Sequence, residues 1–575
     1  GYTLLRSPGQ GVEVIKGKAI NEEMDEENDI DVKTAIVPVP SVLPRIIRLP
    51  DVSEANSRHC FVFLEDMLMF YAARFFVGYD LLEARAFRIT RDADLYIDEE
   101  DAQDLVVEVE RQLKKRQRGQ AVRLEFEVGT SRFMRRFMTQ EMNLEKEDMY
   151  QIDGPLDMTV FFGFCGIKGY NHLRYPEAHP HSPWSMLELK RTPETNIFDM
   201  IREKDLLIHL PYESFDESVV NFLYSAANDK DVLAIKQTLY RVSSSSPVVQ
   251  ALEKAVQNGK QVTVLMEVKA RFDEANNILM ARRLEKAGAH VIYGLVGLKT
   301  HSKCTLVIRR EKDGIRRYVH VATGNYNAST AKLYTDLGIL TCNDRFGIDA
   351  SAFFNLLSGY SDPPIWDSFI VAPINLRQRC IELIDREIHF AKNGEDAHMI
   401  AKMNSLLDKG IIEKLYEASQ AGVKIELIVR GICVLIPGIP GISDNITVRS
   451  IVGRFLEHSR IFWFRNGGRE ELYISSADWM PRNLNDRVEL MVPIEDPEIK
   501  RRLKQMVDIE LSDNQKAHIM QADGTWLKTI SAENQLCAQE YFQKIAEKRD
   551  AEDEMTLAQK LEPYTPVLGH GDGSD

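Results

Sequence analysis

The sequence predicts an α/β fold in which two similar domains follow one another, behind a smaller region that mixes strands and helices. From about residue 196, segments with helical spacing alternate with short apolar segments, the pattern of a sheet covered by helices. The pattern then recurs, with His301-Ser302-Lys303 corresponding to His458-Ser459-Arg460 at an offset of 157 residues. Gly259 and Gly422, which end two corresponding helices, are 163 residues apart. We interpret this repeat as a tandem duplication, because its period is far longer than that of a solenoid.

Length and composition are those of a multidomain globular protein. At about 100–200 residues per domain, the 575 residues suggest three or four domains. The net charge of −15 argues against general adsorption to nucleic acid or anionic membranes. No apolar run approaches the roughly 18 residues that a membrane span needs. Seven scattered cysteines without a CxxC pair suggest reduced thiols and a cytoplasmic location, with peripheral membrane association left open.

The first part of the chain predicts a partial α+β domain over residues 1–187. Residues 1–40 suggest little regular structure, and the acidic run at 22–31 suggests a solvated loop. Short or alternating apolar patterns predict strands over 61–64 and 122–128, with a helix over 99–118 between them. A proline-rich linker is expected over 171–195.

The two α/β domains are expected over residues 188–369 and 370–560, with a disordered tail over 561–575. The first domain predicts helices over 248–259 and 276–288 and strands over 262–266, 290–293, 304–308 and 318–321. The second predicts a helix over 411–421, strands over 423–429, 459–464 and 471–474, and closing helices over 496–510 and 531–548. Asp496 is the expected N-cap of the first closing helix, with Pro497 at its first position.

The duplicated triplets suggest a phosphoryl-transfer site shared between the two domains. Alternate residues of a strand point the same way, so His301 would face with Lys303 and His458 with Arg460. Phosphoryl transfer through a covalent intermediate needs a neutral nitrogen nucleophile on one side of phosphorus and a proton donor or anion stabiliser on the other. Histidine suits both roles, because its unperturbed pKa is about 6.5.

Further cationic and polar residues fit the charge of a phosphate. Arg241, Arg271 and Arg430 follow apolar segments, and strand ends are where open α/β sheets usually bind ligands. The segment 324–327, which ends at Asn327, offers backbone donors and side-chain amides.

Each of these patterns also has an ordinary structural interpretation. A lone strand-end arginine is more often a surface ion-pair partner, and His320 is as readily a core histidine as a functional one. His172, His179 and His181 resemble a metal cluster, but their proline-rich setting favours an ordinary loop. Residues 294–300 lack the GxxxxGK[ST] spacing of a nucleotide-binding P-loop.

Several longer segments resemble the polyphosphate kinase family of the histidine-phosphorylating class. They are VLAIKQTLYR (232–241), ARFDE (270–274), GLKTHSK (297–303), ATGNYN (322–327), LYTD (333–336), GRFLEHSR (453–460) and MPRNL (480–484), with Arg487. The resemblance spans about residues 196–550, and FRITRDADL (87–95) resembles the head domain of the family. It implies tandem phospholipase D-like α/β domains and an ATP:polyphosphate phosphotransferase.

The resemblance also implies roles for individual residues. The phosphorylated histidine of the family falls on His301 and its second essential histidine on His458. The family's nucleotide contacts fall on Tyr334, Arg430 and His458. By analogy Arg487 and Glu489 lie in the same pocket. The carboxylates of Asp336 and Glu489 are candidates to orient the two histidines, with the pairing left open.

The family's magnesium site falls beside Arg241 and Arg271. Because an arginine has no lone pair to offer a cation, we take both as phosphate contacts next to a phosphate-bound Mg²⁺. The implied partners are ATP, ADP and inorganic polyphosphate, in a homodimer or homotetramer. Family members carry an N-terminal helical domain with an asparagine that contacts the base. Neither is found here, so we expect the chain to start inside the head domain.

Two alternatives remain. The phospholipase D signature HxKxxxxD would suggest a phosphodiesterase, but the position of its aspartate holds Ile308 in the first half and Arg465 in the second. A non-catalytic polyphosphate-binding protein would keep the arginines and tolerate loss of either histidine.

Overall fold

A computed structural model describes residues 2–6, 32–50, 59–93, 105–116, 119–187, 195–359 and 365–560. The chain forms two compact units, the first of residues 1–97 and 110–176 and the second of residues 98–109 and 177–575. The acidic run at 22–31 and the tail at 561–575 lie outside the described residues. The domain boundaries expected at 187/188 and 369/370 stay predictions.

The first unit contains small sheets with short helices. One sheet has the order β2 (Val32–Ile36), β1 (Tyr2–Arg6), β5 (Asp80–Arg85), another has the order β6 (Phe87–Arg91), β7 (Ala121–Glu127), β8 (Met149–Ile152), and β3 (Ile46–Arg48) pairs with β4 (Phe61–Phe63). The helices are α1 (Leu64–Phe70), α2 (Ala72–Phe75) and α4 (Arg132–Met142), and α3 (Leu105–Arg116) spans both units. The strands expected over 61–64 and 122–128 are confirmed as β4 and β7. Leu124 and Phe126 of β7 pack on Met134 and Met138 of α4, which explains the alternating pattern of that strand.

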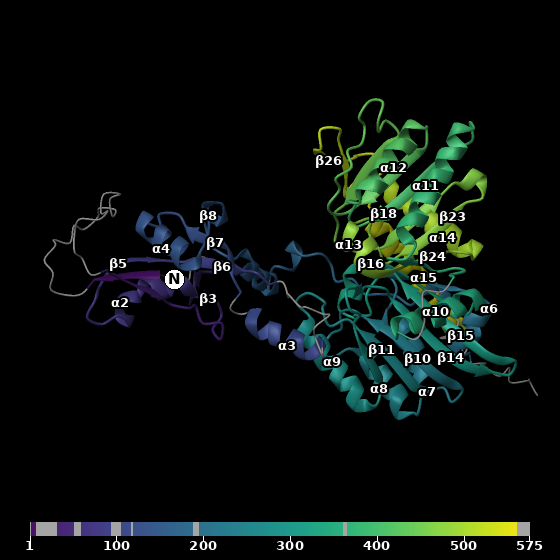
Figure 1. The fold of residues 1–575 in the computed structure, drawn as a ribbon, viewed down its shortest axis with the longest axis horizontal. Coiled ribbons are helices and arrows are strands. Elements are labelled where there is room, and N and C mark those ends of the chain that lie inside the picture. Colours follow the sequence, from purple (N-terminus) through teal and green to yellow (C-terminus); the bar gives the residue numbers. More distant parts are fainter. Residues whose placement is uncertain are drawn as a thin grey trace, which may run out of the picture. The chain divides into compact units, whose positions relative to one another are not determined.

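The second unit contains two large sheets (Figure 1). Both sheets have the same strand order. In the first sheet the order is β12 (His290–Tyr293), β11 (Gln261–Met266), β10 (Val232–Leu239), β14 (Cys304–Glu311), β15 (Gly314–Ala322), β16 (Tyr334–Thr341), β21 (Leu456–Glu457). In the second it is β20 (Ile446–Ile451), β19 (Lys424–Val429), β18 (His398–Met403), β22 (Arg460–Phe464), β23 (Glu471–Ser475), β24 (Arg487–Pro493), β13 (Lys299–Thr300). β9 (Leu206–Leu210) pairs with β16, and β17 (Ile370–Ala372) correspondingly pairs with β24. We call the described residues 195–359, which form most of the first sheet and its helices, the first lobe, and residues 365–560, which form most of the second, the second lobe. Their matching order confirms the predicted tandem α/β fold.

Helices accompany both sheets, and a hairpin extends the second. The first lobe holds α6 (Ile197–Glu203), α7 (Asn221–Asn228), α8 (Pro247–Gln257), α9 (Glu274–Ala287) and α10 (Asp344–Leu357). The second holds α11 (Leu376–Lys392), α12 (Lys409–Gln420), α13 (Pro481–Asn485), α14 (Pro497–Leu511) and α15 (Ala538–Lys560), with the hairpin of β25 (Ala517–Met520) and β26 (Trp526–Lys528) beside β20. Figure 1 shows α11 and α12 over the second sheet, and their apolar sides share its core. No helix among the described residues is long and apolar enough to cross a membrane.

The lobes exchange one short strand each, next to the two histidines. β13 comes from the first lobe and pairs in parallel with β24 of the second, Lys299 opposite Arg487. β21 comes from the second lobe and pairs in parallel with β16 of the first, Tyr334 opposite Leu456. His301 follows β13 and His458 follows β21 in the sequence. The exchange therefore ties each histidine to the sheet of the opposite lobe.

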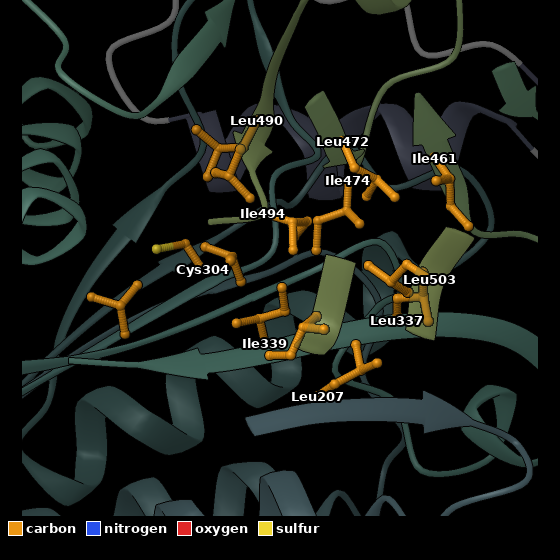
Figure 2. Close-up of a cluster of buried hydrophobic side chains, with 14 of the residues drawn as sticks. Leu207, Cys304, Leu337, Ile339, Ile461, Leu472, Ile474, Leu490, Ile494 and Leu503 are labelled. Atoms are coloured by element: carbon orange, nitrogen blue, oxygen red, sulfur yellow. The ribbon is translucent and has the colours of Figure 1, made fainter. Parts of the chain in front are cut away.

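A hydrophobic core joins the lobes (Figure 2). Cys304, Leu337 and Ile339 of the first lobe belong to the same buried cluster as Ile474 and Leu490 of the second. Burial of such side chains contributes about 25 cal/mol for each Å² of apolar surface removed from water. The contact fixes the lobes against each other, so residues from both can share a site.

The sequence predicted the start of one closing helix correctly and that of the other wrongly. Asp496 caps α14 as expected, accepting hydrogen bonds from the N–H groups of Glu498 and Ile499. The helix expected over 531–548 begins only at Ala538, so its predicted start was wrong. The preceding residues are held by Asn514 instead, whose N–H donates to the Leu536 carbonyl and whose carbonyl accepts from Ser531. These long-range bonds compete with helix formation.

Candidate active site

The two histidines are buried, and each is held by backbone contacts to the opposite lobe. His301 is 7% exposed and His458 is 9% exposed. The N–H groups of His301 and Ser302 both donate to the carbonyl of Val488, at 2.9 Å each. The N–H of His458 donates to the hydroxyl of Thr335 at 3.2 Å. The ring positions therefore depend on the strand exchange.

Each imidazole also hydrogen-bonds a carboxylate of the opposite lobe. His301 Nδ1 lies 2.9 Å from Glu489 on β24, and His458 Nδ1 lies 2.8 Å from Asp336 on β16. These contacts answer the pairing question that the sequence left open. The side chain of Asn483 donates to Glu489 at 2.6 Å, and the hydroxyl of Thr323 donates to Asp336 at 2.6 Å.

A close backbone approach makes room for the Asp336 carboxylate. A Cβ atom on Gly324 would lie 2.3 Å from the carboxyl carbon of Asp336, a distance that atoms do not tolerate. Glycine at this position therefore lets the carboxylate reach His458. Gly324 belongs to the segment 324–327, from which the sequence predicted backbone donors and side-chain amides for phosphate, but it acts here through Asp336.

The carboxylates determine which ring nitrogen can react. Because each carboxylate accepts a hydrogen bond from Nδ1–H, the neutral imidazole keeps its lone pair on Nε2. Burial lowers the pKa of His301 well below its usual range, and Lys303, Arg487 and Arg460 act in the same direction. Burial also lowers the pKa of His458, while Asp336 opposes the shift. His301 is thus an unprotonated nitrogen base at neutral pH.

Lys303 and Arg460 supply positive charge between the histidines. The amine of Lys303 donates to the carbonyl of His301 and acts electrostatically on both Glu489 and Asp336. Burial lowers the pKa of this amine to about 7, and Glu489 limits the shift. Arg460 is 3.2 Å from His458 Nε2 and donates to the His458 carbonyl at 2.6 Å. Each triplet therefore brings its cation next to its own histidine, although residues 301–303 lie between β13 and β14 and not within the strand that the prediction assumed.

Three further arginines lie on the His301 side. Arg487 is 3.9 Å from Glu489, and its charge contributes to the shift of the His301 pKa. Arg241 donates to the backbone carbonyl of Arg271 at 3.1 Å and pairs with Asp273 at 3.0 Å. The charge of Arg241 acts on Tyr240, whose ring stands edge-on to His301 with centroids 4.7 Å apart, and the charge of Arg271 acts on Lys299, so both arginines lie on the His301 side.

The predicted nucleotide contacts Tyr334 and Arg430 lie on the His458 side. The Tyr334 ring is 5.1 Å from the His458 ring. The guanidinium of Arg430 donates twice to the amide oxygen of Asn404, at 2.9 and 2.8 Å, and Asn404 in turn donates to the His458 carbonyl. A ligand between the histidines would meet arginines from both lobes.

Two residues singled out by the sequence have local roles. The side-chain oxygen of Asn327 accepts from the N–H groups of Ser329 and Thr330, so it caps its own turn. His320 is a core histidine: it is 1% exposed, its Nδ1 bonds the Tyr326 hydroxyl, and burial lowers its pKa to about 3. Among the described residues, no group of histidine, cysteine and acidic side chains could hold a metal ion.

Sequence reasoning missed several residues that support the site. Tyr240 and Asn404 contact the histidines, and Asp478 binds the guanidinium of Arg460 at 3.1 Å. Tyr240 stood inside a quoted segment, next to Arg241, and could have been found there. Asp478 and Asn404 carry no local signal, because their contacts span 18 and 54 residues.

Comparison with known families decides the affiliation. Three family models match in succession: polyphosphate kinase middle domain over residues 10–164, C-terminal domain 1 over 196–363 and C-terminal domain 2 over 369–539. The chain belongs to the polyphosphate kinase family. The residue pairs described above lie in the two C-terminal domains of that family.

Individual relatives agree with this affiliation. Polyphosphate kinase from Halalkalibacterium halodurans is 52% identical over 496 residues, covering 86% of this chain and 69% of the relative. Polyphosphate kinase from Bacillus anthracis is 49% identical, covering 89% of this chain and 72% of the relative. The crystal structure of polyphosphate kinase from Porphyromonas gingivalis matches with a TM-score of 0.79 and 31% identity, covering 96% of this chain and 78% of that one. As a polyphosphate kinase, the chain is a phosphotransferase.

Proposed function

We propose that the chain transfers the γ-phosphoryl group of ATP to inorganic polyphosphate through a phosphohistidine at His301. The observation that carries this proposal is the crossed pair of hydrogen bonds, His301 with Glu489 and His458 with Asp336. It supplies two oriented imidazoles, each with Nδ1 held by a carboxylate, with Nε2 of His301 as the nucleophile and Nε2 of His458 beside the guanidinium of Arg460. The lowered pKa of His301 keeps its Nε2 unprotonated at neutral pH.

In the first step, the lone pair of His301 Nε2 attacks the γ-phosphorus. The bond from phosphorus to the oxygen that bridges the β- and γ-phosphates breaks, and ADP leaves with that electron pair. The negative charge of the bound triphosphate raises the pKa of His458, so the ring can donate a proton from Nε2 toward the leaving oxygen.

In the second step, a terminal oxygen of polyphosphate attacks the phosphohistidine. The N–P bond breaks and returns the lone pair to His301, and the polyphosphate chain is one phosphate longer. Reversal of both steps makes ATP, because the anhydride bonds exchanged are similar. Glu489 holds the imidazole in place throughout and balances the charge of the phosphohistidine state.

Cations provide most of the remaining stabilisation. Lys303, Arg460 and Arg487 act electrostatically on His301, where charge accumulates on the transferring oxygens. Arg241 and Arg271 lie at the rim and suit the outer phosphates. Arg430 and Tyr334, on the His458 side, suit the nucleotide.

Mg²⁺ fits this site only as part of the nucleotide complex. No group of histidine, cysteine and acidic side chains in the described chain could hold the ion, so its donors would be phosphate oxygens and water, beside Arg241 and Arg271. Bound there with the nucleotide, Mg²⁺ would supply positive charge toward the phosphate oxygens. By family resemblance the protein would act on ATP, ADP and polyphosphate as a cytoplasmic homodimer or homotetramer.

The proposal is tested with ATP labelled at the γ-phosphate. The native protein should acquire acid-labile, base-stable label, whereas ATP labelled at the α-phosphate should give none. His301→Ala should remove the label. His458→Ala should slow polyphosphate synthesis by about 10²–10⁴-fold with an unchanged circular dichroism spectrum.

His290→Ala is the matched control, because His290 is an exposed histidine on β12 of the first lobe. It should retain labelling and synthesis. Label that persists in His301→Ala would exclude His301 as the nucleophile. Unchanged synthesis in His458→Ala would refute the two-histidine mechanism and favour a different phosphate chemistry on the same fold.

A further inference from the structure

The loop that carries His458 is held from outside the second sheet by a glutamine of α15. Gln539 is 4% exposed, and its amide oxygen accepts from the N–H of Phe455 at 2.9 Å. Its amide nitrogen donates to the Phe455 carbonyl at 2.9 Å and to the Glu457 carboxylate at 2.6 Å. One side chain thus binds both backbone groups of Phe455 and the carboxylate next to His458.

The loop is shaped to admit this side chain. A Cβ atom on Gly453 would lie 2.4 Å from the amide oxygen of Gln539. With a larger residue at this position, the Gln539 amide would have to shift away from its hydrogen bonds to Phe455 and Glu457. Gly453 therefore leaves room for the amide in the position where it binds the loop.

Glu457 connects the glutamine to the His458–Asp336 pair. The same carboxylate accepts from Lys402 at 2.6 Å and from the hydroxyl of Thr335 at 2.8 Å. That hydroxyl in turn accepts from the N–H of His458. Thr335 precedes Asp336 just as Glu457 precedes His458, so one buried network positions both members of the pair.

The start of α15 is itself held in place, so Gln539 can hold the His458 loop in a fixed position. Asp513 accepts from the N–H of Ala538 at 2.8 Å. One turn later, Phe542 stands edge-on to Tyr212, with centroids 5.5 Å apart, and Tyr212 stands edge-on to Phe455 at 5.6 Å. Aromatic packing and hydrogen bonds therefore hold the loop from the same helix.

The corresponding histidine of the first lobe is held differently. The N–H of Thr300, the residue before His301, donates to Glu267 at 2.7 Å, and Glu267 follows β11 of the same lobe. His301 needs no added helix for this contact, whereas His458 depends on α15. The duplication is thus asymmetric at its two histidines.

We propose that Gln539 is a positioning residue for His458, through which the C-terminal helix α15 sets the geometry of proton donation to the leaving group. The proposal rests on the proposed role of His458. Gln539 touches neither substrate nor imidazole, so its effect must appear in the chemical step. A misplacement of about 1 Å at a reacting group can cost about 10²-fold in rate.

The test compares Gln539→Ala with Gln543→Ala in the full chain. Gln543 is the same residue type one turn later on α15, and it bonds the 179–181 segment and Glu547 instead of the His458 loop. Gln539→Ala should lower kcat about ten- to hundredfold with the KM for ATP within about twofold of native, since only the chemical step is disturbed. Gln543→Ala should match the native protein.

A donor–acceptor exchange makes the test independent of a truncated side chain. Gln539→Glu removes the donor to Glu457 and places two carboxylates together, so kcat should fall as well. Adding Glu457→Gln restores one donor opposite one acceptor, and kcat should recover at least about fivefold over Gln539→Glu alone.

The outcomes separate this inference from the proposed function. A folded Gln539→Ala protein with kcat within about twofold of native would overturn the inference, as would a double variant that shows no recovery. If Gln539→Ala does not fold, the comparison of kcat between Gln539→Glu and the double variant with Glu457→Gln decides. If His458→Ala itself retains full synthesis, the proposed function fails first, whatever Gln539 does.

Discussion

Lys303 is an amine with an unusual environment for a phosphate-binding group. It is 2% exposed, and its pKa of about 7 reflects the cost of burying its charge. Its neighbours Glu489 and Asp336 each already accept a hydrogen bond from a histidine. An incoming phosphate would supply the negative charge that favours the protonated amine.

Binding of a phosphate chain should therefore take up protons at Lys303. At about pH 7.5, above its pKa of about 7, part of this amine is unprotonated, and a bound anion raises the pKa and recruits a proton. We expect tripolyphosphate binding, measured by titration calorimetry in two buffers of different ionisation enthalpy, to take up more protons in the native protein than in Lys303→Arg.

Lys303→Arg is a matched comparison because Arg460 occupies the corresponding place in the second lobe, and arginine stays protonated throughout. Equal proton uptake by the two proteins would show that Lys303 is already charged before the phosphate chain binds.

At this scale the sequence predicted the histidines but left their carboxylate partners unassigned. His301 and His458 were found because the duplication repeats a short local triplet. The pairs His301–Glu489 and His458–Asp336 span 188 and 122 residues and cross between the lobes. Spacing along one strand carries no information about such a crossing.

At the scale of elements, the reciprocal exchange of β13 and β21 organises the site. Each is only two residues long, and each ends directly before a histidine. The sequence contains the alternation of helices and strands that predicted both sheets, but strands this short carry no periodicity to detect. Their placement depends on tertiary contacts, such as that of Glu267 with Thr300 in β13 and that of Gln539 with Glu457 in β21.

Removing the Glu267 carboxylate should disturb β13 directly. Glu267 is fully buried and accepts from the N–H groups of Thr300 and Lys269, both at 2.7 Å. Glu267→Ala leaves these donors unpaired, which should cost about 1–3 kcal/mol of stability and slow phosphorylation of His301. Urea unfolding and single-turnover labelling measure the two effects.

Glu267→Gln is the milder counterpart, because its amide oxygen can still accept one of the two bonds. We expect its stability and labelling rate to lie between those of native and Glu267→Ala. Identical behaviour of native and Glu267→Ala would mean that Thr300 is positioned by other contacts.

At the scale of the whole molecule, the two lobes together form the candidate active site of a protein that is acidic overall. The net charge is −15, yet Lys303, Arg460 and Arg487 all act on His301. Their burial beside the hydrophobic core between the lobes limits screening by the solvent. The composition argued against general adsorption to nucleic acid or anionic membranes, and by itself it could not reveal a local cation cluster assembled from distant segments.

The most direct test of this arrangement is the chemical identity of the phosphohistidine. If Glu489 of the second lobe holds Nδ1 of His301, only Nε2 can reach phosphorus. After brief labelling with ATP and proteolysis under alkaline conditions, ³¹P NMR and tandem mass spectrometry against both isomeric standards should find the phosphoryl group on Nε2 of His301. A phosphoryl group on Nδ1, or on any other residue, would contradict the crossed-lobe site.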